Sequence, residues 1–298
     1  MPTSELSYKS ADGTRIVAYR WDPEDLPRAA IQLTHGMGEH ALRYGHVAQA
    51  LNDDRFVVYA QDHRGHGASA GSDAYGDLGP GSWAALVDDI GLLSVKIRED
   101  HADLPLILLG HSMGSFAVQQ YLLDHSADVD GVVLTGTAAI DLLEPALDLD
   151  QPLDLTGFNA AFQPARTDYD WLSRDEAIVD AYIADPACGF GIDVESAKAM
   201  FLGARRLADP AQVALMRSDL PVYIAAGEAD PVNGGLALLT PLTDRYQAAG
   251  LTDVTVRIYP GGRHEILNET NRDEVIAALN SWLDRVVTSS DPGEPETS

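Results

Sequence analysis

Ser112 stands at the centre of Gly110-His111-Ser112-Met113-Gly114, a G-x-S-x-G pattern that can present a serine hydroxyl as a nucleophile. Such a turn crowds the backbone, so the residues two before and two after the serine must be small, and both are glycine here. An apolar run at 106–109 predicts a strand before the turn, and residues 116–123 predict a helix after it. A serine that merely caps a helix is the alternative. The strand–turn–helix context favours the nucleophile.

A serine hydroxyl attacks only when a base takes its proton and a third group orients that base. Around this kind of turn the chain order is serine, acid, histidine, with acid and histidine at the ends of late strands. Asp230 follows a predicted strand at 222–226, and His264 follows one at 254–259. Of the nine histidines, His264 alone lies after Asp230. We therefore predict Ser112, Asp230 and His264 as a catalytic triad, with Glu228 and Asp141 as alternative acids.

Two backbone N–H groups are predicted to meet the oxyanion that attack on a carbonyl creates. One belongs to Met113, directly after the nucleophile. The second is expected from the turn His35-Gly36-Met37-Gly38, whose glycines let the backbone approach a substrate closely, and we assign it to Met37. An ordinary glycine-rich turn is the alternative interpretation.

Neither of two metal-like patterns has the spacing that its ligands require. Asp62-His63-Arg64-Gly65-His66 lacks the arrangement of a zinc hydrolase, and the run from His264 to Asn268 has asparagine where a second histidine must stand. Cys188 is the only cysteine and is interpreted as a packed thiol. No phosphate-binding glycine pattern is present in the sequence. We predict neither a metal nor a cofactor.

The elements that must position these residues alternate between apolar strands and amphipathic helices. This alternation predicts an α/β fold with a mostly parallel central sheet covered by helices on both faces. The serine turn between a strand and a helix is the motif of the α/β-hydrolase fold, which we therefore predict. Strands are expected at 6–8 and 15–21 (a hairpin), 29–34, 56–60, 105–109, 131–135, 222–226 and 254–259. Helices are expected at 44–51, from Ser82 as N-cap to 97, and at 116–123, 236–248 and 271–287.

The alternation stops between residues 137 and 217, where apolar residues keep helical spacing and no strand is evident. We predict a helical lid insertion there, with residues 1–136 and 218–298 forming the core and 288–298 a disordered tail. Because the insertion lies between two sheet strands, it should cover the edge where open α/β sheets bind ligands. Residues with large apolar side chains in it are candidates for a substrate pocket: Phe158, Phe162, Met200 and Phe201.

The formal net charge of −26 over 298 residues argues against nucleic acid and anionic membranes as partners, because both would be repelled. The first residues lack the basic and apolar regions of a secretion signal, which predicts a cytoplasmic location. Acidic residues also stud the early insertion, so membrane contact through it should be weak at most. The sequence leaves the oligomeric state open.

The assembled motifs resemble the monoacylglycerol lipase and lysophospholipase-like group of α/β-hydrolases. The matching stretches are His35–His40 with Arg43-Tyr44, Asp62–Gly67 with Ser69, Gly110–Gly114, Gly227–Asp230, His264-Glu265 with Asn268-Glu269, Trp171–Asp175 and Asp185-Pro186. They extend from about residue 30 to the last helix. The resemblance implies the same triad and oxyanion donors, and hydrolysis of a small single-acyl ester such as a monoacylglycerol or lysophospholipid through an acyl-enzyme. The acidic early insertion departs from the apolar lids of lipid-facing members.

Three other functions share this fold. A proline-type serine aminopeptidase would hold a free amine with a carboxylate of the insertion such as Glu144 or Glu195. A non-catalytic binding protein would not need the triad. A thioesterase would need a site for an anionic carrier, which the net charge disfavours.

Overall fold

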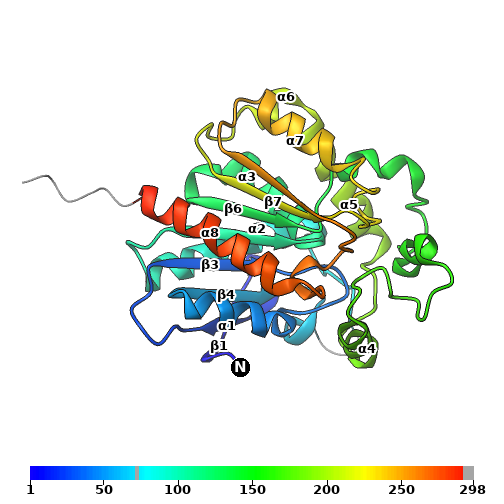
Figure 1. The fold of residues 1–298 in the computed structure, drawn as a ribbon, viewed down its shortest axis with the longest axis horizontal. Helices are drawn as coiled ribbons and strands as arrows, with labels where there is room; N and C mark the ends of the chain where they lie inside the picture. Colours follow the sequence, from blue (N-terminus) through cyan, green and yellow to red (C-terminus); the bar gives the residue numbers. More distant parts are fainter. Residues whose placement is uncertain (71–73, 291–298) are drawn as a thin grey trace, which may run out of the picture.

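A single eight-stranded sheet organises the chain, as seen in a computed structural model that describes residues 1–70 and 74–290. The strand order is β1-β2-β4-β3-β5-β6-β7-β8. The pairs β1–β2 and β2–β4 are antiparallel, and all the other neighbouring pairs are parallel. The strands are β1 (Ser4–Lys9), β2 (Arg15–Trp21), β3 (Ala29–Thr34), β4 (Phe56–Asp62), β5 (Leu106–His111), β6 (Gly131–Thr135), β7 (Val222–Gly227) and β8 (Val254–Tyr259). The predicted α/β-hydrolase fold is confirmed (Figure 1).

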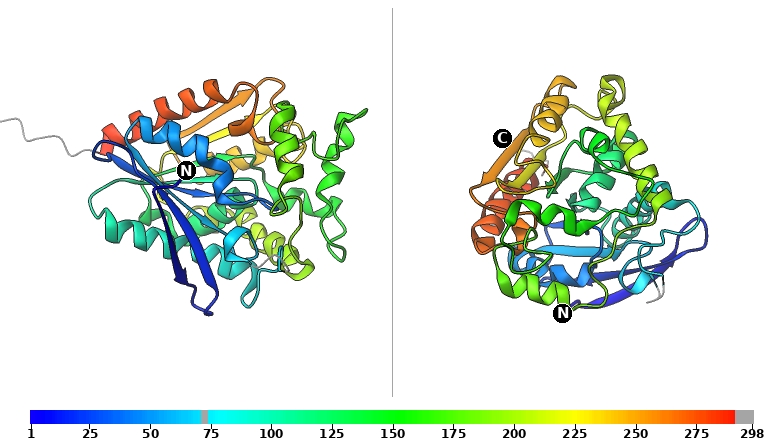
Figure 2. Two further views of the ribbon diagram at one scale, coloured as in Figure 1. Left: turned by 90° about the horizontal axis from the view of Figure 1, so that it is seen from below. Right: turned by 90° about the vertical axis from the view of Figure 1, so that its right-hand side faces the viewer.

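Helices cover both faces of this sheet, as Figures 1 and 2 show. On one face α1 (Gly45–Asp53) and α8 (Arg272–Ser290) share a buried apolar cluster with the sheet. On the other face α2 (Ser82–Asp100), α3 (Met113–His125) and α7 (Leu239–Ala248) share a second cluster. Because β5 is buried on both sides, its residues alternate between the two clusters, and the strand reads as an unbroken apolar run.

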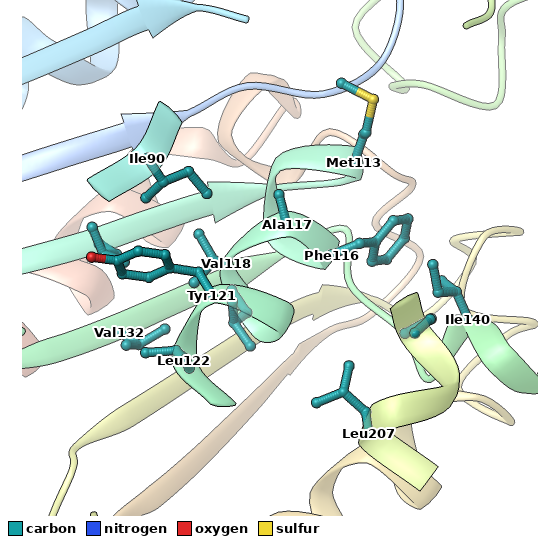
Figure 3. Close-up of a cluster of buried hydrophobic side chains, with 14 of the residues drawn as sticks. Ile90, Met113, Phe116, Ala117, Val118, Tyr121, Leu122, Val132, Ile140 and Leu207 are labelled. Carbon is teal, nitrogen blue, oxygen red and sulfur yellow. The ribbon is translucent and has the colours of Figure 1, made fainter. Parts of the chain in front are cut away.

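Helix α3, which begins at the nucleophile turn, is buried along nearly its whole length. In Figure 3 its side chains Phe116 and Tyr121 lie among residues from α2, from β6 and from the segment between β6 and β7. Ile140 and Leu207 of that segment reach the same cluster. The helix is therefore fixed from several sides, and this holds its first turn in place.

Residues 137–217, between β6 and β7, contain helices and no strand throughout their described length. We call these residues the insertion. It lies beyond the carboxyl ends of the central strands (Figure 1). Its elements are the 3₁₀ helices η4 (Ile140–Leu142), η5 (Glu144–Ala146), η6 (Leu155–Phe162) and η7 (Arg205–Ala208), and the α-helices α4 (Glu176–Ala184), α5 (Val194–Ala204) and α6 (Pro210–Val213).

Several element ends differ from the predicted ones. Ser82 is not the N-cap of α2: Gly81 occupies that position in a left-handed conformation, and the Ser82 hydroxyl bonds instead to Ser196 Oγ at 2.7 Å. Helix α3 begins at Met113 rather than 116, and α7 at Leu239 rather than 236. Helix α8 continues through Ser290, so the predicted disordered tail does not begin at 288. Residues 291–298 lie outside the described part of the chain.

The chain's remaining short helices are η1 (Ala41–Tyr44), η2 (Gly67–Ser69), η3 (Ser126–Asp128) and η8 (Ile266–Asn268). Among the described residues, no helix is both long and apolar enough to cross a bilayer.

Candidate active site

Ser112 lies on the turn between β5 and α3 with φ +51° and ψ −124°, a conformation that residues with a Cβ rarely adopt. The surroundings impose it. A Cβ on Gly110 would lie 2.7 Å from Ser115 Cα, and one on Gly114 would lie 2.3 Å from Thr34 O. Both flanking glycines are therefore required by packing, as the sequence pattern predicted. The Ser112 N–H donates to Thr135 O at 2.9 Å, which ties the turn to β6.

His264 and Asp230 are brought together from the ends of β8 and β7. His264 Nδ1 lies 3.0 Å from Asp230 Oδ1, and both side chains are buried. A Cβ on Gly136 would lie 2.8 Å from His264 Cε1, so this glycine leaves room for the imidazole. Burial alone would lower the pKa of His264, but the charge of Asp230 and its hydrogen bond outweigh burial and raise that pKa. The pair has the arrangement of a base with its orienting acid.

The two alternative acids lie elsewhere. Glu228 is exposed, and its Oε2 accepts from Gly261 N at 3.0 Å. Asp141 forms a two-pronged ion pair with Arg245, at 2.7 and 2.8 Å. Asp230 Oδ1 also accepts from Val232 N at 2.9 Å, whereas its buried Oδ2 has no hydrogen-bond partner among the described residues. Asp230 is the carboxylate that meets His264.

The two predicted oxyanion donors both lie at the cavity that contains Ser112. Met37 and Met113 line the same cavity as Ser112 and His264. Within the described part of the chain, neither the Met37 N–H nor the Met113 N–H has a hydrogen-bond partner. A Cβ on Gly36 would lie 3.1 Å from Ser112 Cβ, which shows how closely this turn approaches the serine. Both amides are thus available to an incoming oxyanion.

A buried ion network that sequence reasoning missed supports both sides of the site. Glu39 Oε1 accepts from Gly36 N at 2.6 Å, and Arg43 bridges Glu39 to Glu265, the neighbour of His264. Burial would raise the pKa of Glu265, but the charge and hydrogen bonds of Arg43 outweigh it and lower that pKa to about 2. Arg43 also stacks on Tyr182 of the insertion, 4.8 Å from the ring centroid. The i, i+4 spacing of Glu39 and Arg43 was the one signal available in the sequence.

Three buried imidazoles, His35, His63 and His66, pack beneath the turn that carries Met37. Gly38 N donates to His66 Nε2 at 3.3 Å, and His63 N donates to His35 Nε2 at 3.0 Å. Burial lowers the pKa of His35 well below its usual value and that of His66 to about 4, so both accepting rings are neutral and can accept these bonds. The Asp62 carboxylate meanwhile accepts from backbone N–H groups of Ala41 and Ala68. This stretch buttresses the oxyanion turn.

The cavity beside Ser112 encloses about 790 Å³ of space between atoms, part of it open to solvent. Three of the predicted pocket residues, Phe158, Met200 and Phe201, line it. Phe162 does not: its ring lies under the guanidinium of Arg263, 4.5 Å from the ring centroid. Ten apolar residues of the insertion line the cavity: Ile140, Leu143, Leu147, Leu153, Leu155, Phe158, Trp171, Leu172, Met200 and Phe201.

The insertion forms backbone hydrogen bonds with the loop that carries His264. His264 N donates to Trp171 O at 3.3 Å, and Glu265 N donates to Leu172 O at 2.8 Å. The Trp171 ring lies 5.0 Å from the His264 ring, measured between centroids. The segment that forms the cavity wall therefore also fixes the base.

Comparison with known proteins places the chain among hydrolases. The family described as "Serine aminopeptidase, S33" matches residues 25–271. The chain is 35% identical over 288 residues to a monoacylglycerol lipase of Mycolicibacterium smegmatis, covering 94% of this chain and 96% of that protein. It is 29% identical over 297 residues to a monoglyceride lipase of Mus musculus, covering 96% and 92%.

A thermostable carboxyl esterase from Bacillus coagulans, solved in complex with glycerol, superimposes with a TM-score of 0.86 at 29% identity. The match covers 96% of this chain and 99% of that one.

Proposed function

Because this chain belongs to the serine aminopeptidase S33 family of α/β-hydrolases and is a hydrolase of the monoacylglycerol lipase type, we propose that it cleaves monoacylglycerols and similar single-acyl esters. The observation that carries the proposal is the Asp230–His264 pair beside Ser112, at one end of a largely apolar cavity. An acyl chain fits the apolar wall, and its ester carbonyl would then lie near the serine.

The mechanism follows from the proposed roles. Neutral His264 accepts the proton of Ser112 as the hydroxyl oxygen attacks the ester carbonyl, while Asp230 holds the imidazole in the required tautomer. The Met37 and Met113 amides bind the oxyanion. His264 then gives its proton to the departing alcohol, which leaves an acyl-serine. Water, deprotonated by His264, attacks this ester, releases the carboxylic acid and restores Ser112.

The insertion supports an acyl substrate better than a free amine. Glu144 is paired with Arg205 at 2.5 Å, Glu195 is exposed beside Lys198, and neither lines the cavity. Glu39 and Glu265, which do line it, are both paired with Arg43. Asp154, at the exposed rim, accepts bonds from Thr156. An aminopeptidase would need a carboxylate free to bind the substrate's ammonium group.

We further propose that the enzyme works in the cytoplasm and meets membranes weakly at most, without nucleic acid as a partner. The net charge of −26 supports this proposal, because anionic surfaces would repel the chain.

A substrate panel tests the function. Wild-type protein and Ser112→Ala would be assayed on mono-, di- and triacylglycerols, a lysophospholipid, short p-nitrophenyl esters and an amino-acyl naphthylamide. We expect the highest kcat/KM on a monoacylglycerol or lysophospholipid, and no turnover above background by the variant. Faster hydrolysis of the naphthylamide than of any ester would favour the aminopeptidase. Equal turnover by the variant would remove Ser112 from the mechanism.

A further inference from the structure

Three metal-ligating side chains meet where the oxyanion turn contacts the insertion. His40 lies two residues after the turn, and Asp185 and Cys188 lie in the loop after α4. Their ligand atoms lie within 4.8 Å of one another, and His40 Nε2 is 2.9 Å from Asp185 Oδ2. Among the described residues this is the one cluster of at least three such groups. None of the three belongs to the proposed triad or oxyanion donors.

We propose that His40, Asp185 and Cys188 bind a Zn²⁺ ion. A mixed set of nitrogen, oxygen and sulfur donors suits this borderline-soft cation, whereas Mg²⁺ and Ca²⁺ prefer oxygen alone. Zinc bonds of about 2.0 to 2.3 Å in a tetrahedron place neighbouring donor atoms roughly 3.3 to 3.8 Å apart. The observed cluster needs an adjustment of only about 1 Å to reach that spacing. Water would take the fourth position.

The backbone around the cluster is already arranged for this. Gly189 N donates to Gly38 O at 3.0 Å, so the two segments are held together beside the ligands. A Cβ on Gly38 would lie 2.3 Å from Phe190 O, which shows that the loop fits closely on the turn. Asp185 Oδ1 accepts from Ala187 N at 2.8 Å, and this leaves Oδ2 directed at His40. Ligands held in this way lose little freedom on binding.

The electrostatic surroundings favour a cation. Arg43 is the nearby positive side chain, and it is already paired with both Glu39 and Glu265. Asp185 therefore adds a net negative charge to the cluster. Burial raises the pKa of the Cys188 thiol, so a bound ion must displace the thiol proton, as Zn²⁺ does at cysteine sites. The His40 and Asp185 side chains are 15% and 35% exposed, which leaves the ion a path from solvent.

The ion would join the insertion to the turn that carries Met37. His40 is three residues from Met37, and Cys188 is adjacent to Gly189, which bonds to that turn. Occupancy should therefore hold the insertion against the oxyanion turn. The melting temperature should rise with the logarithm of free Zn²⁺ once its concentration exceeds the Kd. This inference is independent of the proposed substrate, because binding is measured directly.

The test uses the full chain, stripped of metal and then dialysed against buffered Zn²⁺. Bound zinc would be counted by mass spectrometry of the element in wild type, His40→Gln, Asp185→Asn and Cys188→Ser. The matched control is His125→Gln, because His125 lies 3.0 Å from Asp128 in an exposed pair without a cysteine. We expect one ion per wild-type or control chain. Losing a ligand should weaken affinity at least about a hundredfold, since loss of an outer-shell partner alone costs 10- to 100-fold.

Two further measurements distinguish the loss of a zinc ligand from the loss of the fold. Metal-free melting temperatures identify any variant that has lost its fold. Co²⁺ added to wild type should give a thiolate charge-transfer band that Cys188→Ser lacks and His125→Gln keeps. The inference fails if folded wild type binds less than one zinc per chain, if Cys188→Ser and His40→Gln bind as tightly as wild type, or if the Co²⁺ spectrum shows no thiolate band.

Discussion

The carboxyl edge of the sheet and the insertion face each other across one cavity, and they hold their shapes differently. At the sheet edge, Ser112, Asp230 and His264 follow strands that are paired in a continuous parallel ladder. In the insertion, which has no strand in residues 137–217, each short helix must satisfy its own ends. Aspartates do this at four of these helices, whose N-termini are capped by Asp154, Asp175, Asp193 and Asp209.

This contrast explains the acidic insertion. Several of its carboxylates serve as caps, and others pair with arginine, as Asp141 does with Arg245 and Glu144 with Arg205. These acids are engaged in hydrogen bonds or ion pairs within the fold. The sheet edge should therefore determine the rate of the chemistry, and the insertion should determine which acyl group is accepted.

The largest effect should come from the sheet edge. Ser112→Ala removes the nucleophile, so kcat on a short p-nitrophenyl ester should fall roughly 10⁴- to 10⁶-fold, leaving only oxyanion binding and substrate positioning. Steady-state assays at equal concentrations of folded wild type and variant would measure it. A loss of less than tenfold would mean that another residue performs the attack.

Asp230→Asn should be the next most damaging change. Without the carboxylate, the His264 imidazole is no longer held in the tautomer that can accept the serine proton. In other triads this change lowers kcat about 10⁴-fold. The residual activity carries a second signature. His264 must be neutral to act, so kcat/KM should rise with pH through its raised pKa, and removing Asp230 should move that rise to lower pH. If the pH dependence of kcat/KM is the same in Asp230→Asn as in wild type, Asp230 does not set the pKa of the catalytic base.

The insertion should instead change selectivity. Met200 lines the cavity, whereas Leu202 on the same helix is 63% exposed. Met200→Ala should lower kcat/KM for a long-chain ester about 10- to 100-fold relative to an acetyl ester, because apolar contacts with the acyl chain are lost. Leu202→Ala should leave the ratio unchanged. Comparing the two esters in one preparation cancels any loss of folded enzyme, and an unaltered ratio in Met200→Ala would contradict an acyl pocket here.

The smallest effect tests the capping aspartates. Asp193 accepts from Ser196 N at 2.8 Å at the start of α5. Asp193→Ala should lower the free energy of unfolding by about 1 kcal/mol, whereas Asp193→Asn should retain most of the cap. Urea denaturation would measure both. If Asp193→Asn lowers the free energy of unfolding as much as Asp193→Ala does, the negative charge of Asp193 stabilises the fold, rather than its capping hydrogen bond.

The strands of the sheet were predictable because each one is marked by the pattern of apolar residues within its own short segment. Strands β3 and β6 begin and end at the predicted residues, since burial on both faces turns a strand into an unbroken apolar run bounded by polar residues. Asp230 and His264 could be proposed from chain order, because parallel strands deliver their carboxyl ends to one edge.

What was not predictable depends on contacts between distant residues. Arg43 meets Glu265 across 222 positions, and His40 meets Asp185 across 145. No periodicity relates such partners. The same limit explains Phe162. It lies four residues after Phe158, which in an α-helix would place both side chains on one face, but in the 3₁₀ helix η6 its ring faces Arg263 instead of the cavity. Ser82 failed as a cap because a hydroxyl partner on α5 was available.

The most direct test of the central claim is where a fluorophosphonate reacts. The reagent loses fluoride as a serine oxygen bonds to phosphorus, and peptide mass spectrometry locates the adduct. We predict one adduct per chain, on the peptide that contains Ser112, with esterase activity lost in step with labelling and no adduct in Ser112→Ala. Full turnover by an unlabelled protein, or an adduct on another residue that abolishes activity, would contradict the account.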